Sequence, residues 1–173
     1  IECWAPYAHG SLSLRGALEN SCNPSFMQLG QRIGKERFYK YLQGFGFLQK
    51  TGVRMSGESS SIFFPYENCH EVELATMSFG QRFKITPLQL ITAVSATVNG
   101  GNLMQPRIVS KVVNTDTGVE TEILPVKVRQ VVSEETSSKI KSMMQSVVTD
   151  GTGRYAAVNG YSVGGKSGTS EPR

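Results

Sequence analysis

The apolar residues of the chain recur mainly at helical spacing, and β-prone residues gather in one later stretch. A short helix is predicted over residues 12–19. A longer helical region follows, broken near Gly34, with apolar positions at Phe26, Leu29, Ile33 and Phe38. Asn23-Pro24 is a good start for this region, because asparagine caps helices and proline suits the first helical position.

The middle of the chain alternates irregular and helical patterns. Residues 44–71 are rich in glycine and serine and predict a long loop, which a compact domain accommodates when the loop is functional or packs on itself. Thr86-Pro87 opens the clearest helix of the sequence, and Asn99-Gly100-Gly101 ends it.

The last third of the sequence changes character. Residues 106–132 are β-prone around a turn at residues 116–118 and predict a small β-hairpin region. Ser133 caps a helix that is expected to run through Val148. Residues 161–169 read as a strand. Together these elements predict an α+β fold.

Composition limits the function classes. The 173 residues are 39% hydrophobic and 18% charged, the balance of a globular domain with its own core. The net charge of +4 is dispersed, without the dense basic runs of a nucleic-acid arm, so no nucleic-acid partner is expected. No stretch approaches the roughly 20 apolar residues of a membrane helix, and no secretory signal opens the chain.

Two short motifs carry candidate chemistry: Ser21-Cys22-Asn23 and Lys166-Ser167-Gly168-Thr169. Acyl transfer by a serine enzyme needs a nucleophile, a base, an oxyanion hole and a handle for the substrate. The motifs offer candidates for the last three. Ser21 can relay a proton between the nucleophile and the leaving amine, and Asn23 can bind a substrate amide carbonyl through its side-chain NH₂.

The second motif suits the recognition of a peptide carboxylate. The Lys166 ammonium attracts the carboxylate and favours deprotonated neighbours. The Ser167 and Thr169 hydroxyls extend the polar surface, and the Thr169 backbone N–H is a candidate oxyanion donor. Gly168 lacks a Cβ, so a peptide can lie against it as an added strand.

Each motif alone is weak evidence, because Ser-Cys-Asn-Pro is also an ordinary helix start and Lys-Ser-Gly-Thr an ordinary strand end. Their order, their separation and the helices between them strengthen the case. A third triplet, Ser-x-x-Lys, supplies the nucleophile in enzymes that carry this motif set. Ser138-Lys139-Ile140-Lys141 fits it formally but lies between the other two motifs on a solvated helix face, so Ser138 is interpreted as a surface residue.

Longer blocks carry a resemblance to a known family. The sequence closely resembles class B penicillin-binding proteins in Met77-Ser78-Phe79-Gly80-Gln81, Ile85-Thr86-Pro87-Leu88-Gln89-Leu90, Asn99-Gly100-Gly101, Thr152-Gly153 and Val163 to Glu171. Cys3-Trp4, His9-Gly10 and Ser21-Cys22-Asn23-Pro24 are most similar to the sporulation-specific branch, the stage V sporulation protein D type. The resemblance covers essentially the whole chain, and Ser167 replaces the commoner threonine.

The resemblance implies the penicillin-binding protein/serine β-lactamase-like transpeptidase fold. Residues 1–173 are expected to be a partial transpeptidase domain, dominated by the helical subdomain with a small β-hairpin region and the Lys-Ser-Gly-Thr strand. The nucleophile segment and the strands that flank that motif strand are expected to lie outside the chain. The chain alone is therefore expected to be inactive.

The resemblance further implies a D,D-transpeptidase that crosslinks peptidoglycan stem peptides ending in D-Ala-D-Ala through a serine acyl-enzyme. It implies covalent binding of β-lactams, a glycosyltransferase partner, no cofactor and no metal. The parent protein is expected on the extracytoplasmic face of the bacterial membrane, anchored by an N-terminal helix. A β-lactam-sensing or non-catalytic scaffold domain is the alternative. A β-lactamase would need a deacylating base, for which no well-placed residue is apparent.

Cys3, Cys22 and Cys69 form an odd count that argues against a disulfide-built scaffold. Two buried thiols are the plain interpretation of Cys3 and Cys22. The sharper hypothesis is a redox pair whose disulfide would pin the Ser-x-Asn turn, as an oxidising compartment and the resemblance suggest. A zinc site of Cys3, His9 and Cys22 would have three ligands at poor spacing, so no metal site is predicted.

Overall fold

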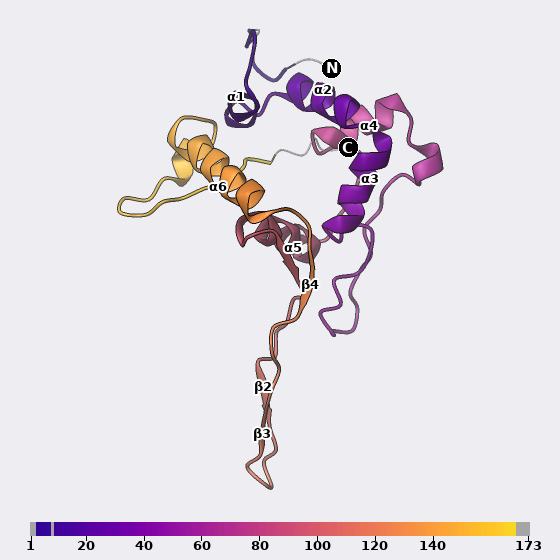
Figure 1. Cartoon of the computed structure of the whole chain (residues 1–173), viewed down its shortest axis with the longest axis vertical. Helices are drawn as coiled ribbons and strands as arrows, with labels where there is room; N and C mark the ends of the chain where they lie inside the picture. The colour runs from indigo at the N-terminus through magenta and orange to yellow at the C-terminus, as the bar shows by residue number, and fades with distance from the viewer. Residues whose placement is uncertain (1–2, 8, 169–173) are drawn as a thin grey trace.

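A computed structural model of the chain describes residues 3–7 and 9–168. Helices dominate the described part (Figure 1). The α-helices are α1 (Leu14–Glu19), α2 (Asn23–Ile33), α3 (Lys35–Gly44), α4 (Glu71–Ser78), α5 (Pro87–Val98) and α6 (Glu134–Thr149). Two short 3₁₀ turns are η1 (Tyr66–Asn68) and η2 (Arg154–Ala156). None of the helices in this part of the chain is both long and apolar enough to cross a bilayer.

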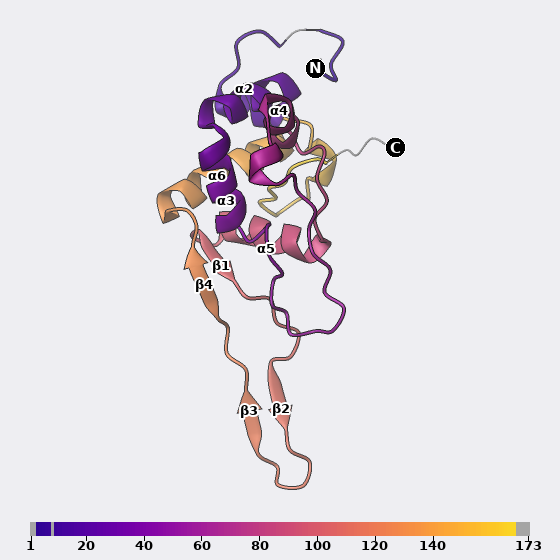
Figure 2. The same cartoon turned by 90° about the vertical axis from the view of Figure 1, so that its right-hand side faces the viewer.

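The strands form two separate antiparallel pairs. Strand β1 (Asn102–Met104) pairs with β4 (Lys127–Gln130), and β2 (Lys111–Val113) pairs with β3 (Glu120–Glu122). The β2–β3 hairpin extends away from the helices in both views (Figures 1 and 2). The predicted hairpin region is therefore confirmed, whereas β1 was not predicted.

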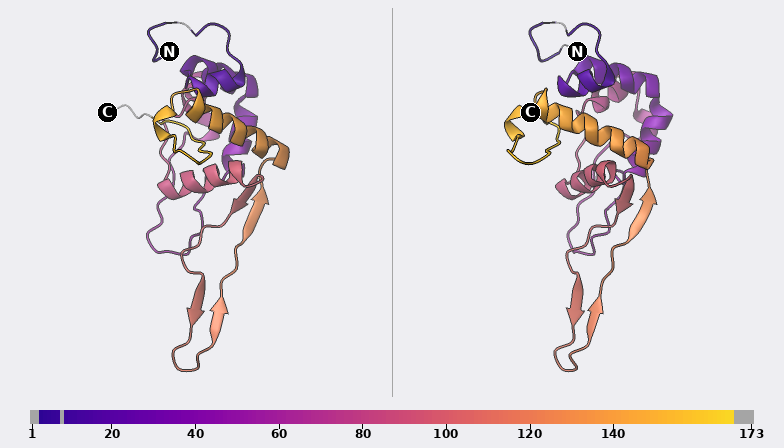
Figure 3. Two further views of the ribbon diagram at one scale, coloured as in Figure 1. Left: turned by 90° about the vertical axis from the view of Figure 1, so that its left-hand side faces the viewer. Right: turned by 60° about the vertical axis from the view of Figure 1, so that its left-hand side comes forward.

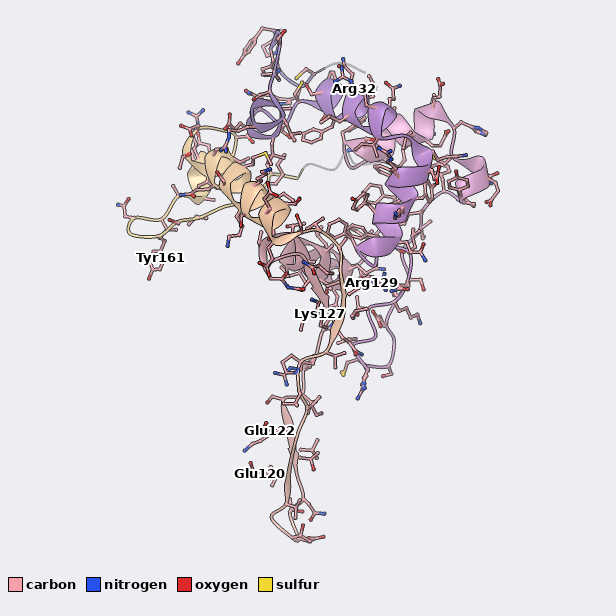
Figure 4. The ribbon with its side chains drawn as sticks, in the orientation of Figure 1. Arg32, Glu120, Glu122, Lys127, Arg129 and Tyr161 are labelled. Carbon is pink, nitrogen blue, oxygen red and sulfur yellow. The ribbon has the colours of Figure 1, made fainter. Side chains whose placement is uncertain are left out.

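The hairpin carries charged side chains beside exposed valines and is tied to the body at its base. Glu120 and Glu122 lie along it in Figure 4, and Glu120 accepts a hydrogen bond from Lys111 Nζ at 2.8 Å. Near its base, an Arg129 Nη donates to the backbone oxygen of Gln43 at 2.9 Å. These charged edges discourage further strand pairing.

Local signals set several helix boundaries. Gly34 separates α2 from α3 with a φ of 78°, a conformation that glycine adopts without strain. Thr86 caps α5 by accepting from the backbone N–H of Gln89, and Ser133 caps α6 in the same way. These helices match the sequence-based predictions. Helix α4 was missed, because the sequence analysis assigned residues 72–76 to no element and treated Met77 and Ser78 only as part of a family signature.

Two local predictions are wrong. Asn23 is not the cap of α2: Cys22 occupies the N-cap position and Asn23 is already helical. Residues 161–168 form no strand, because they meet no strand ladder within the described residues. The backbone N–H of Gly165 instead donates to the Met144 oxygen of α6 at 3.1 Å.

The core is small and lies where α3 and α4 meet the loop between them (Figure 3). Its buried centre is Tyr39, Cys69, Leu74 and Met77, surrounded by partly buried phenylalanines. The predicted long loop packs on itself and on the helices. Tyr39 Oη donates to the Phe64 oxygen at 2.6 Å, and Gln89 Nε2 donates to the Gln49 oxygen at 2.8 Å.

Candidate active site

Ser21 sits in a strained turn at the end of α1. Its φ is 49°, in the left-handed region that normally favours glycine. The Ser21 N–H donates to the Leu18 oxygen at 3.2 Å, and the Cys22 N–H donates to the Ala17 oxygen at 3.1 Å. This pair of bonds is a Schellman motif, a C-terminal helix cap with serine where glycine is usual. Backbone strain of about 1–3 kcal/mol is typical of such positions and is often found at functional sites.

Asn23 begins the next helix directly after this turn. Cys22 is the N-cap of α2, and Asn23 occupies the first helical position instead of the predicted cap position. Asn23 and Ser21 instead line the same pocket. The structure therefore places Asn23 beside Ser21 in this pocket and not at the helix cap.

Close packing of α2 on α4 brings a third segment to the turn. A Cβ built on Gly30 of α2 would lie 1.7 Å from Ser78 Oγ of α4, so only glycine permits this approach. Ser78 Oγ itself donates to the Leu74 oxygen at 2.6 Å. The approach places residues 78–81 on the wall of the pocket that contains Ser21.

Lys166 comes from the far end of the chain and meets Ser21. Its Nζ donates to Ser21 Oγ at 2.7 Å, and also to the backbone oxygen of Ser167 at 2.8 Å and to Ser167 Oγ at 3.2 Å. The two motifs predicted from sequence are therefore joined by a direct hydrogen bond. Ser138 is exposed, as predicted, and is not among the residues that line this pocket.

The end of α6 anchors the segment that carries Lys166. The Thr152 N–H donates to the Glu19 oxygen of α1 at 3.0 Å, and Thr152 Oγ1 lies 3.3 Å from Ser167 Oγ. Gly151 permits this docking, since a Cβ there would lie 2.6 Å from the Glu19 oxygen. Backbone contacts to α1 and α6 thus fix Lys166 near Ser21 without a strand pairing.

The environment of Lys166 affects its protonation. The residue is exposed as a whole, yet packing around the ammonium removes part of its hydration. This desolvation lowers the pKa of Lys166 below the usual lysine value. The ammonium therefore releases its proton more readily than a surface lysine, and the side-chain oxygen nearest to it is Ser21 Oγ at 2.7 Å.

The pocket has a volume of about 480 Å³ and is open to solvent. It brings together Ser21, Asn23, Lys166, Ser167 and Gly168 from the sequence prediction. Thr169 lies outside the described residues. The prediction missed Trp4, Leu18, Phe26 and residues 78–81, which complete the walls. The family resemblance drew attention to residues 77–81, but only the tertiary structure shows that residues 78–81 lie beside the Ser21 turn.

The cysteines are all free thiols. Cys69 is buried in the core, apart from the other two. Cys3 Sγ lies 3.4 Å from His9 Nδ1. The ligand atoms of Cys3, His9 and Cys22 all lie within 4.8 Å of one another. Sequence spacing made these residues poor partners, but the fold brings them together.

Comparison with known proteins identifies the family. The profile of the penicillin binding protein transpeptidase domain matches residues 1–172. The chain belongs to this family, and its fold is a partial piece of the family's mixed α/β transpeptidase fold.

Individual relatives agree with this assignment. The chain is 46% identical to stage V sporulation protein D of Bacillus subtilis, over 99% of this chain and 27% of the relative. It is 36% identical to penicillin-binding protein PbpB of Mycolicibacterium smegmatis, over 90% of this chain and 25% of the relative. The chain thus spans about a quarter of the length of these relatives.

Solved structures share the fold. The D,D-transpeptidase domain of a peptidoglycan glycosyltransferase from Eggerthella lenta matches with a TM-score of 0.88 and 28% identity, over 100% of this chain and 45% of that chain. Penicillin binding protein 3 of Mycobacterium tuberculosis, in complex with aztreonam, matches with a TM-score of 0.81 and 33% identity. That match covers 90% of this chain and 37% of the other.

Proposed function

We propose that the chain is part of a peptidoglycan D,D-transpeptidase that crosslinks stem peptides ending in D-Ala-D-Ala. The hydrogen bond from Lys166 Nζ to Ser21 Oγ carries this proposal, because it joins the proton relay and the carboxylate handle in one pocket. Several relatives bear the name peptidoglycan D,D-transpeptidase, which supports the substrate class. β-Lactams are proposed ligands of the same site, since a related structure holds aztreonam.

The proposed reaction proceeds through an acyl-enzyme. A serine hydroxyl from a segment outside this chain attacks the carbonyl of the penultimate D-alanine, and the C–N bond to the terminal D-alanine breaks. Ser21 passes the proton to the leaving amine, while Asn23 binds the amide carbonyl of the substrate. An amine of a second stem peptide then attacks the ester and regenerates the serine hydroxyl.

The second motif would hold the substrate during both steps. Lys166 and the hydroxyls of Ser167 and Thr169 attract the terminal carboxylate. Gly168 leaves room for the peptide backbone. The Thr169 N–H serves as an oxyanion donor, opposite the N–H of the nucleophile.

The location and partners of the parent protein follow as proposals. An enzyme with these substrates works on the extracytoplasmic face of the bacterial membrane, held there by an N-terminal helix. It depends on a glycosyltransferase that supplies glycan strands.

Cys3 and Cys22 are proposed as a redox pair. Their sulfur atoms lie within 4.8 Å, so small movements would bring them to the roughly 2.05 Å of a disulfide. Cys22 lies between Ser21 and Asn23, so a disulfide would restrain both. Peptide mapping of air-oxidised protein should recover a Cys3–Cys22 crosslinked peptide, and its absence would rule the pair out.

Fluorescent-penicillin labelling tests the enzymatic proposal. Residues 1–173 alone should not be labelled, whereas a chain extended at both ends should be labelled and should release D-alanine from a stem-peptide mimic. Labelling without D-alanine release would favour the sensor or scaffold alternative. Labelling of residues 1–173 alone would mean that a serine inside this chain is the nucleophile and that the motif assignment is wrong.

A further inference from the structure

Three metal-binding side chains converge behind the Ser-x-Asn turn. Cys3 and His9 come from the N-terminal segment, which arches over α2 in Figure 2, and Cys22 is the N-cap of α2. Their ligand atoms all lie within 4.8 Å of one another, and Cys3 Sγ is 3.4 Å from His9 Nδ1. In a tetrahedral zinc site, standard bond lengths place a sulfur and a nitrogen ligand about 3.6 Å apart, and two sulfurs about 3.8 Å apart. The three groups are therefore close to the arrangement that a zinc ion requires.

Burial gives a second, independent indication. Cys22 is only 5% exposed, and Cys3 and His9 are partly buried. Nε2 of His9 is buried and has no hydrogen-bond partner among the described residues. A buried imidazole nitrogen without a partner is unfavourable, and native proteins rarely leave one. An ion bound at Nε2, or an ordered water at Nε2 when Nδ1 binds the ion, would remove that deficit.

We propose that Cys3, His9 and Cys22 bind a zinc ion as three of its four ligands. Two thiolates and one imidazole form a donor set that suits zinc better than the hard cations magnesium and calcium. On binding, each cysteine that was protonated releases its thiol proton to solvent, and the imidazole binds in its neutral form. Zinc affinity should therefore decline as the pH falls.

The three proposed ligands also line a cavity. The three residues line a space of about 1040 Å³ that Arg32 of α2, labelled in Figure 4, also borders. A water molecule can complete the tetrahedron from this side. This space is distinct from the Ser21 pocket, because the two cavities have no lining residue in common.

The bound ion would crosslink the N-terminal segment to the Ser-x-Asn turn. Residues 3–9 contain no helix or strand in their described part, and one hydrogen bond that holds them runs from Trp4 Nε1 to the Asn20 oxygen at 2.9 Å. Bound zinc would add a crosslink through Cys22, next to Ser21. The same two sulfurs cannot hold zinc and form a disulfide, so the zinc-bound and oxidised states exclude each other.

The test uses the reduced full-length protein. After incubation with zinc and dialysis, elemental analysis should find one zinc per chain. Cobalt in place of zinc should give the near-ultraviolet thiolate-to-cobalt charge-transfer band and the visible bands of a tetrahedral centre. Oxidation that links Cys3 to Cys22 should release the metal. Failure to retain zinc, or a cobalt spectrum without a thiolate band, would overturn the proposal.

Matched variants locate the site. His9→Asn and Cys3→Ala should each abolish the tetrahedral cobalt spectrum, whereas His70→Asn and Cys69→Ala should retain it. Circular dichroism of each variant confirms that it is folded. Full zinc retention by both His9→Asn and Cys3→Ala would place the metal elsewhere and contradict the proposal. The wild-type cobalt spectrum decides the question even if one variant fails to fold.

Discussion

The ammonium of Lys166 lies 2.7 Å from the hydroxyl of Ser21, although 145 positions separate the two residues in the chain. A hydrogen bond of this length from a charged donor is among the stronger side-chain interactions. It connects the turn after α1 to the segment that α6 anchors. The proposed proton relay and the proposed carboxylate handle therefore act as one unit, and replacing either residue should affect both.

Replacing Lys166 with methionine should reduce acylation of the full-length protein by fluorescent penicillin about 10²-fold or more, the usual effect of losing one preorganised electrostatic group. Methionine keeps the length of the side chain but removes the charge. Lys139 is an exposed lysine of α6 outside the pocket, so Lys139→Met is the matched control and should label normally. Equal labelling by the two variants would show that Lys166 has no role in acylation.

Acylation should decline at alkaline pH with a midpoint below the usual lysine pKa. Burial lowers the pKa of Lys166, so the ammonium that attracts the ligand carboxylate is present below that lowered value and is lost above it. The pH profile of the acylation rate provides the measurement. In the unfolded chain Lys166 keeps its higher, ordinary pKa, so the free energy of unfolding should rise with pH between the folded and unfolded pKa values of Lys166. Lys166→Arg should remove the alkaline decline, because arginine stays protonated; an unchanged profile in this variant would assign the decline to another group.

Ser21→Gly should be more stable than Ser21→Ala by up to about 1 kcal/mol, because glycine adopts the left-handed turn without a Cβ penalty and both variants lose the hydrogen bond from Lys166. Both variants remove the relay hydroxyl and should lose labelling, but only Ser21→Ala retains the Cβ and its strain. Thermal unfolding and penicillin labelling of the two variants separate strain from chemistry. A glycine variant no more stable than the alanine variant would argue against strain at Ser21.

Gly30→Ala should destabilise the protein by about 1–3 kcal/mol, the usual cost of overpacking, because the new Cβ would collide with Ser78. The second substitution Ser78→Gly should restore part of this loss. Gly16 of α1 is a helical glycine whose nearest neighbour would lie 3.4 Å from a Cβ, so Gly16→Ala should be neutral or stabilising. Denaturant unfolding gives the comparison, and equal effects of the two alanines would refute the close contact.

Gln89→Leu should cost about 1–3 kcal/mol of stability, because the buried amide is the donor to the Phe47 and Gln49 oxygens and both would lose it. Gln89 is 2% exposed, whereas Gln31 of α2 is exposed. Gln31→Leu is therefore the control and should change the unfolding midpoint little. A similar, small effect at both positions would mean that the loop does not depend on Gln89.

Local patterns in the sequence determined the elements whose signals lie within a few residues. Thr86 and Ser133 cap their helices through bonds to backbone groups three residues on, and Gly34 breaks the first helical region through its own backbone freedom. The two candidate motifs and the family could also be identified from the sequence, because the order of residues along the chain defines them. The exposed position of Ser138 followed from its helix face.

Tertiary structure alone decided which of these residues meet. Residues 161–168 have a strand-like sequence, yet a strand exists only where another strand accepts its hydrogen bonds, and here Gly165 bonds to α6 instead. Similarly, no local pattern predicts the contact of Lys166 with Ser21 or the cluster of Cys3, His9 and Cys22. Such contacts join distant chain segments that only the packing of α1, α2 and α6 brings together. Closing such long loops costs conformational entropy, and the packing of the helices offsets this cost, not the few residues that meet in the site.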